Sequence, residues 1–155
     1  MQMPWLPSLN MGVSALDDEH RHMFEVLEEL GASVTAANLS GLRVLLDELR
    51  TATLEHFRAE EALMARYRYP ASAAHQAEHE RVRATLASLE SYLRDERLEL
   101  FAHALAAFTA EYFHGVLVHD GLFGRFLRDH GHGEEAAPCH PCSPANPPHP
   151  RPAAS

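Results

Sequence analysis

Histidines and glutamates recur at four-residue intervals on both sides of a Tyr-Pro step in the middle of the chain. The stretch HFRAEEALMARYRYPASAAHQAEH, residues 56–79, holds three histidines and three glutamates. His56 and Glu60 precede the Tyr-Pro step, and His75 and His79 follow it. Residues four apart on a helix project about 40° apart and about 6 Å along the axis, so each pair faces one way. Two such pairs form a candidate metal site.

The alternative is a solvated helix surface, since a lone helical histidine is usually a surface or core residue. Two adjacent pairs with the same spacing favour metal binding instead. Imidazole with carboxylate suits iron, zinc or copper better than calcium or magnesium. His20 and His114 can lie at a comparable depth in a bundle. One ion cannot use so many ligands, so the set predicts two metals, with Glu60 placed to bridge them.

Four long segments show helical periodicity, and no run of residues is typical of a strand. Asp17 or Asp18 is expected to cap the first helix, and Pro70 to end the second, because the residue before a proline avoids the α region. The connections are short, which makes neighbouring helices antiparallel. The prediction is an all-α, up-down-up-down four-helix bundle, with helices over about residues 17–37, 41–67, 72–95 and 98–128.

A change in composition divides the chain of 155 residues near its end. Residues 1–130 are predicted to form one domain, and the Pro- and His-rich residues 131–155 a disordered tail. The tail contains both cysteines, in the motif CHPC at 139–142, which could bind Zn²⁺ or Cu⁺. A single Cys-x2-Cys in such a segment is weak, so we expect the motif to have no role or an adventitious one.

The charge and hydropathy of the chain exclude several classes of protein. The formal net charge of −9 argues against binding nucleic acid through phosphate contacts. No run approaches the roughly 18–20 apolar residues of a membrane span, and the start lacks the features of a secretory signal. The expectation is a cytoplasmic protein with no membrane span.

The segments LDDEHRHMF and HFRAEEALM, then Tyr-Pro and His-x3-His, resemble the bacteriohemerythrins of the hemerythrin family. The second segment is very close to the family's HFxxEExxM. The likeness covers roughly residues 5–128. It implies two non-haem iron ions, joined by an oxo or hydroxo bridge, that bind dioxygen reversibly. Carried over by position, the implied iron ligands are His20, His56, Glu60, His75 and His79.

The fourth predicted helix, which reads EYFHGVLVHDGLF, departs from the family's usual His-x4-Asp. Asp120 falls where the bridging aspartate is expected, but the usual histidine position is then Gly115, with His114 one residue early. The alternative pairs His114 with His119 and replaces the aspartate by histidine. We favour His114 and Asp120, which requires a helix irregularity near Gly115.

The implied site has about five imidazoles and about two carboxylates, whereas oxygen-activating di-iron bundles use more carboxylates. The prediction is therefore an oxygen-binding protein and not an enzyme, for transport, storage or delivery of dioxygen. It would be a monomer in transient contact with an oxygen-using enzyme. The alternatives are a single-domain sensor of oxygen, nitric oxide or iron, and a di-iron protein with weak oxidase or nitric-oxide-reducing activity. Apolar side chains are expected to keep water from the site, among them Phe24, Phe57, Leu117 and Leu122.

Overall fold

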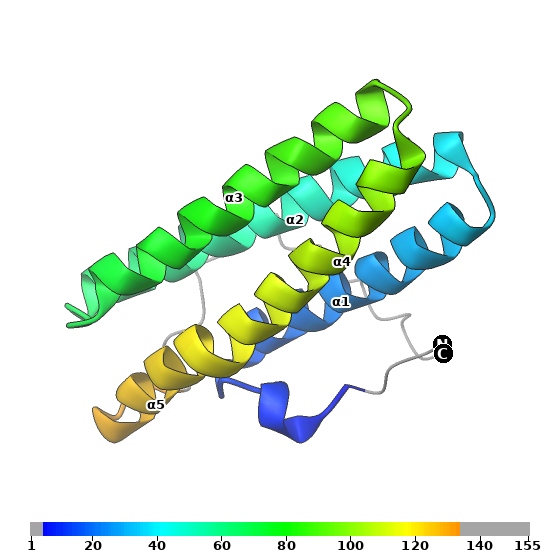
Figure 1. Ribbon diagram of the computed structural model, residues 1–155. Helices are drawn as coiled ribbons and strands as arrows, with labels where there is room; N and C mark the ends of the chain where they lie inside the picture. The colour runs from blue at the N-terminus through cyan, green and yellow to red at the C-terminus, as the bar shows by residue number, and fades with distance from the viewer. Residues whose placement is uncertain (1–4, 134–155) are drawn as a thin grey trace, which may run out of the picture.

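The computed structural model describes residues 5–133, and in this part of the chain it is an up-down-up-down helical bundle with no strand (Figure 1). The predicted fold class is confirmed. A short 3-10 helix, η1 (Pro7–Leu9), comes first, and a π-helix, η2 (Gly115–Asp120), and α5 (Gly121–Asp129) continue the fourth long helix. The long helices of the described part are α1 (Ser14–Thr35), α2 (Leu39–Arg66), α3 (Ser72–Arg94) and α4 (Leu98–His114).

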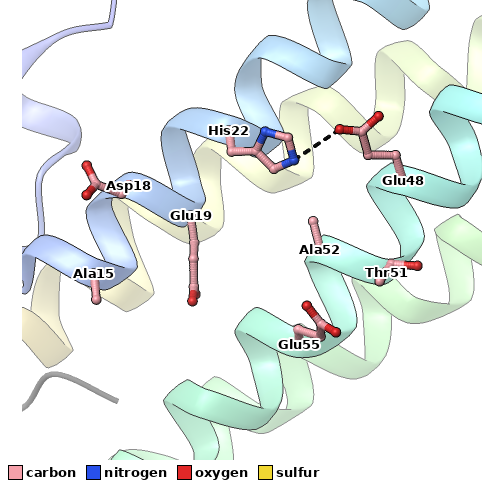
Figure 2. A pocket seen from close by; sticks show the side chains of 8 residues that line it. All are labelled: Ala15, Asp18, Glu19, His22, Glu48, Thr51, Ala52 and Glu55. Carbon is pink, nitrogen blue, oxygen red and sulfur yellow. Dashed lines mark ion pairs between the residues drawn. The ribbon is translucent and has the colours of Figure 1, made fainter. Parts of the chain in front are cut away.

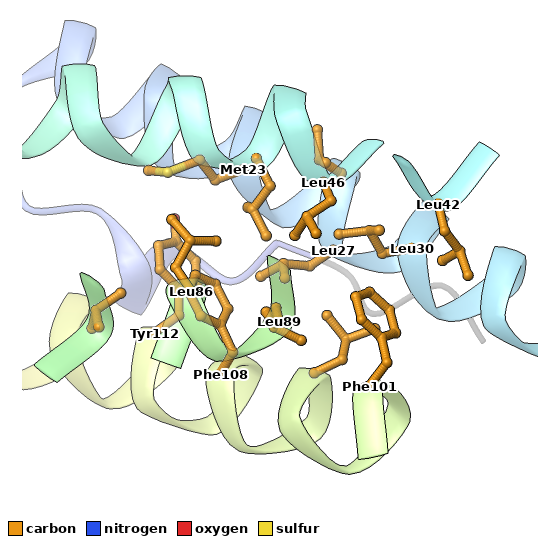
Figure 3. Close-up of a cluster of buried hydrophobic side chains, with 14 of the residues drawn as sticks. Met23, Leu27, Leu30, Leu42, Leu46, Leu86, Leu89, Phe101, Phe108 and Tyr112 are labelled. Carbon is orange, nitrogen blue, oxygen red and sulfur yellow. The ribbon is translucent and has the colours of Figure 1, made fainter. Parts of the chain in front are cut away.

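The bundle interior contains two apolar clusters. Helices α1 and α3 each pack against both α2 and α4, so the four helices enclose a common core. The larger cluster fills the half that holds the α1–α2 and α3–α4 connections, and Figure 3 shows its leucine and aromatic side chains meeting between the helices. The smaller cluster lies toward the α2–α3 connection and comprises Met11, Val13, Leu16, Leu63, Met64, Phe123 and Leu127.

The first three long helices end in the same way. In each, the chain leaves the helix through a non-glycine residue in the left-handed backbone region, and the next N–H bonds back across the last turn. After α1, the N–H of Asn38 donates to the carbonyl of Ser33 over 3.0 Å, which is the Schellman arrangement. The left-handed residues are Ala37 (φ 51°), Arg68 (φ 51°) and Glu96 (φ 55°).

The start of the first helix differs from the prediction. Helix α1 begins at Ser14, and no side chain caps it. Asp17 is buried within the first turn and accepts hydrogen bonds from the N–H of Met11 (2.7 Å) and Gly12 (3.1 Å). The expected capping by Asp17 or Asp18 was therefore wrong. Asp17 instead fixes the segment before the helix.

Two further predictions from the sequence concern the C-terminal tail and the absence of a membrane span. Residues 134–155, which contain most of the predicted tail and its CHPC motif, lie outside the described residues. None of the helices in the described part combines the length and apolar character that crossing a bilayer requires.

Replacing Gly124 by alanine tests how closely α5 packs on the segment before α1. A Cβ atom at Gly124 would lie 2.0 Å from the carbonyl oxygen of Met11, which also accepts a hydrogen bond from Arg128. We expect Gly124→Ala to lower the free energy of unfolding by about 1–3 kcal/mol, measured by urea denaturation. The matched control is Gly31→Ala in α1, where nothing lies within 4 Å. It should raise stability by about 0.5–1 kcal/mol, and equal effects of the two changes would contradict the close approach.

Candidate metal centre

Six buried side chains with metal-ligating atoms meet in one layer between the two apolar clusters. Each is at most 5% exposed. Helix α1 contributes one, α2 and α3 contribute two each, and the last residue of η2 contributes one. The four-residue spacing in α2 and α3 turns both members of each pair inward, as the helical geometry requires. The six are His20, His56, Glu60, His75, His79 and Asp120.

These side chains form two groups that share Asp120. The Asp120 Oδ1 atom lies 2.8 Å from Nε2 of His75, and its Oδ2 atom lies 2.9 Å from Nε2 of His20. One carboxylate thus reaches a histidine of each group, which is the geometry of a bridging ligand. The groups are Glu60, His75, His79 and Asp120, and His20, His56 and Asp120.

The second carboxylate, Glu60, also reaches both groups. Its Oε2 atom lies 3.2 Å from Nε2 of His79 and 3.3 Å from Nε2 of His75, within its own group. The same oxygen lies 3.7 Å from Nε2 of His56 in the other group. Glu60 therefore lies within reach of histidines of both groups.

The donor atoms of the layer fit bound cations. Both carboxylate oxygens of Glu60 and the Nδ1 atom of His75 are buried without a hydrogen-bond partner. The Nε2 atoms of His20 and His56 face one another at 2.9 Å. Buried acceptors that are not hydrogen-bonded are costly, and cations between them would satisfy them. The mixture of imidazole and carboxylate ligands is one that iron and zinc accept.

The electrostatics of the layer point the same way. Burial opposes ionisation of Asp120, but hydrogen bonds from His20 and His75 outweigh it and hold the pKa of Asp120 well below its usual range. Burial alone would lower the pKa of His75. The Asp120 and Glu60 carboxylates outweigh it and raise the pKa of His75 to about 10. Without metal, therefore, protons on imidazole balance the carboxylates, and a metal ion takes over that role.

Two histidines of the layer are oriented by further carboxylates. The Nδ1 atom of His56 lies 2.9 Å from Oε2 of Glu19, and Nδ1 of His79 lies 2.9 Å from Oε1 of Glu61. Arg83 donates to the same Glu61 oxygen. Metal-binding histidines commonly bond a carboxylate through their second nitrogen, which fixes the tautomer and the ring direction. Sequence reasoning missed Glu19 and Glu61, although each stands beside a candidate ligand in the chain.

Glu19 also belongs to a groove on the surface of the bundle. This groove, of about 690 Å³, lies between α1 and α2. In Figure 2 the side chain of Glu19 extends into the gap between the two helices, and His22 pairs with Glu48 across it. The groove therefore ends against the outer partner of His56 and not at the buried layer. Half of the residues that line it are acidic, namely Asp18, Glu19, Glu48 and Glu55.

The irregularity expected near Gly115 is present as the π-helix η2. A π-helix brings residues five apart into line, whereas an α-helix turns them about 140° apart. Asp120 consequently points into the layer. The position in line with it is Gly115, where a Cβ atom would meet nothing within 4 Å.

His114 does not join the layer, contrary to the expected pairing with Asp120. It precedes Gly115 by one residue and is exposed, so it lies on the outer side of η2. His119 is also outside both groups, although its ring lies 5.6 Å from the ring of His75. The structure brings these two histidines together with Glu78 in a separate group.

The π-helix also changes which apolar residues face inward. Phe24 and Phe57 are buried as expected. Leu117 and Leu122, which were expected to shield the site, are 50% and 52% exposed. Val116 and Phe123 are buried instead. The extra residue in the π-helical turn changes which side chains face the interior of the bundle.

Comparison with known proteins defines the class of this bundle. The family model named hemerythrin HHE cation binding domain matches residues 11–137. The chain belongs to the hemerythrin family.

Individual relatives agree with this assignment. A bacteriohemerythrin of Stenotrophomonas maltophilia (strain R551-3) is 36% identical over 76 residues, 49% of this chain and half the length of that relative. A bacteriohemerythrin of Pseudomonas aeruginosa (strain LESB58) is 26% identical over 135 residues, 85% of this chain and 76% of that relative. A crystal structure of wild-type hemerythrin superposes with a TM-score of 0.73 at 25% identity, covering 81% of this chain and 97% of the hemerythrin chain. The family implies a non-haem di-iron site, which the donor set described above fits.

Replacing Tyr112 by phenylalanine tests the contact between α4 and the start of the site. The buried Tyr112 hydroxyl donates to the carbonyl oxygen of His20 over 2.9 Å. Removing it should lower the free energy of unfolding of the metal-free protein by about 0.5–1.5 kcal/mol. Tyr92→Phe on α3, at a half-buried residue far from His20, is the control and should change stability by less. No difference between the two variants would show that the hydroxyl does not hold α4 to α1.

Proposed function

We propose that the protein is a non-haem di-iron protein that binds dioxygen reversibly, for its transport, storage or delivery to an oxygen-using enzyme. The observation that carries the proposal is the pair of imidazole–carboxylate groups that share Asp120. The proposed iron ligands are His20, His56, Glu60, His75, His79 and Asp120. Two iron ions held by these residues would supply the redox chemistry of oxygen binding.

The surrounding residues have three tasks in this proposal. Glu60 and Asp120, which each reach histidines of both groups, would hold the two ions. Glu19 and Glu61 keep His56 and His79 in the orientation that ligation needs. The apolar clusters on both sides exclude water, and Phe57, stacked on His79 with ring centroids 3.8 Å apart, covers one face of the layer.

The balance of ligands supports a carrier over an oxygenase. Four imidazoles and two carboxylates face one another in the layer, whereas oxygen-activating bundles use more carboxylates. Neutral imidazoles stabilise higher oxidation states of iron less than carboxylates do. A cytoplasmic location, a monomeric state and contact with an oxygen-using enzyme remain predictions from the sequence.

Anaerobic reconstitution with ferrous iron tests the proposal. We expect about two irons per chain, with charge-transfer absorption bands that appear on adding oxygen and vanish on deoxygenation. His79→Ala should reduce iron content and abolish the bands, because it removes a buried ligand. His103→Ala, at an exposed histidine of α4, should change neither. Binding of zinc alone, or rapid irreversible oxidation on exposure to oxygen, would overturn the carrier function.

One observation favours a second function, weak oxidase or nitric-oxide-reducing activity. Hemerythrins usually have histidine where this chain has Gly115. The metal position at His75 and His79 therefore has one imidazole fewer. A small space beside it, of about 20 Å³, is lined by His75, His79, Gly115 and Asp120, among others. A ligand position left open there could admit a small molecule beside the metal that His75 and His79 would hold.

Adding a histidine at position 115 separates the two functions. Gly115→His places an imidazole in line with Asp120, into space that the chain leaves open. We expect iron to dissociate to a chelator at least about tenfold more slowly and any turnover of oxygen or nitric oxide to fall. The matched control is Gly115→Ala, which adds bulk without a ligand and should leave both properties near those of the unaltered protein. Equal effects of histidine and alanine would show that position 115 does not face the iron.

A further inference from the structure

The π-helix aligns a second pair of residues beside the first. Gly115 and Asp120 are five apart and belong to the inner face. His114 and His119 are also five apart, one step earlier, and their ring centroids lie 5.9 Å apart. On an α-helix they would diverge, so η2 is what brings the two imidazoles together.

We propose a second metal site, distinct from the central layer, formed by His114, His119 and Glu78. It would take a divalent transition metal such as Zn²⁺. Neither histidine belongs to the two central groups, and Glu78 comes from the neighbouring helix α3. The proposal does not rest on oxygen binding by the central layer.

The geometry of the three side chains suits one ion. Their ligand atoms all lie within 4.8 Å of one another, and Nε2 of His119 lies 3.9 Å from Oε2 of Glu78. Zinc binds imidazole nitrogen and carboxylate oxygen at about 2.0–2.2 Å, which places the ligands of one ion about 3–4 Å apart. Small side-chain rotations are enough to bring the three ligand atoms within this range.

The burial of Glu78 is the second observation that points to a ligand. Its side chain is 6% exposed, and its buried Oε2 atom makes an ion pair with Arg81 but no hydrogen bond. That oxygen faces His119, so an acceptor and an imidazole are directed at the same point. His114 is exposed, which leaves one side of the site open to solvent. Two imidazoles and a carboxylate with an open fourth position are a common ligand set for zinc.

Arg81 competes with a metal for the same carboxylate. Its guanidinium forms an ion pair with Oε2 of Glu78. The Arg81 side chain is 68% exposed, so it can turn into solvent when a cation replaces it. The affinity of the site should therefore depend on Arg81, whereas adventitious binding elsewhere should not.

The test is a Zn²⁺ titration of the iron-loaded full chain against a chromophoric chelator. All variants carry Cys139→Ser and Cys142→Ser, which remove the thiols of the CHPC motif as competitors. We expect one tightly bound zinc per chain in addition to iron. His114→Ala should weaken its binding at least about tenfold, and His103→Ala should leave it unchanged. Arg81→Gln should tighten binding, because it removes the competing cation.

Three outcomes would overturn the proposal. Equal zinc affinity of His114→Ala and His103→Ala would mean an adventitious ion only. The same conclusion follows if Arg81→Gln has no effect. If His119→Ala releases iron and leaves zinc binding intact, His119 serves the central layer.

Since His114 is exposed, its loss should leave the circular dichroism spectrum unchanged. If the central layer binds zinc in place of iron, the variants are compared for the last zinc equivalent that binds. The failure of the proposed di-iron function can then be told apart from the failure of the second metal site.

Discussion

Two carboxylates buried in an apolar bundle are the constraint on which the rest of this structure depends. Glu60 is 0% exposed and Asp120 is 5% exposed, and they belong to one layer. Two like charges at this depth are strongly unfavourable unless positive groups lie between or around them. The four imidazoles of the layer meet that need in two ways. In the metal-free protein the neighbouring carboxylates outweigh burial and raise the pKa of His20 and His75. All four imidazoles become neutral ligands when metal binds.

This exchange links metal binding to folding and to pH. The raised pKa of His75 belongs to the metal-free protein, in which an imidazolium sits against Asp120 and Glu60. A metal ion must displace that proton, so its affinity rises with pH until the imidazoles are neutral. The outer carboxylates Glu19 and Glu61 bond the far nitrogen of His56 and His79. They serve to keep the ligating nitrogen turned inward in both states.

The sequence was sufficient for whatever depends on helical repeat. Pairs four residues apart, such as His56 with Glu60, must share a face of an α-helix, and the bundle follows from four such segments with short connections. Features that depart from the helical repeat were harder to predict from the sequence. The chain leaves the first three long helices through Ala37, Arg68 and Glu96, without the glycine that usually occupies such left-handed positions. Leu117 and Leu122 were assigned inward because an unbroken helix was assumed.

In the fourth helix, the position of a residue in the sequence does not predict the direction of its side chain. The backbone hydrogen bonds of a π-helix have less favourable geometry than those of an α-helix. A π-helix therefore persists where other contacts stabilise it. Asp120 supplies such contacts through His20 and His75, and they hold even though Gly115 brings no side chain to the inner face. The extra residue that turns Asp120 inward turns His114 outward and toward His119. A single irregularity therefore removes an imidazole from the inner layer and gathers two imidazoles beside Glu78. The shift of one residue in HGVLVHD is thus a redistribution of metal-binding groups between the inner and outer faces of one helix.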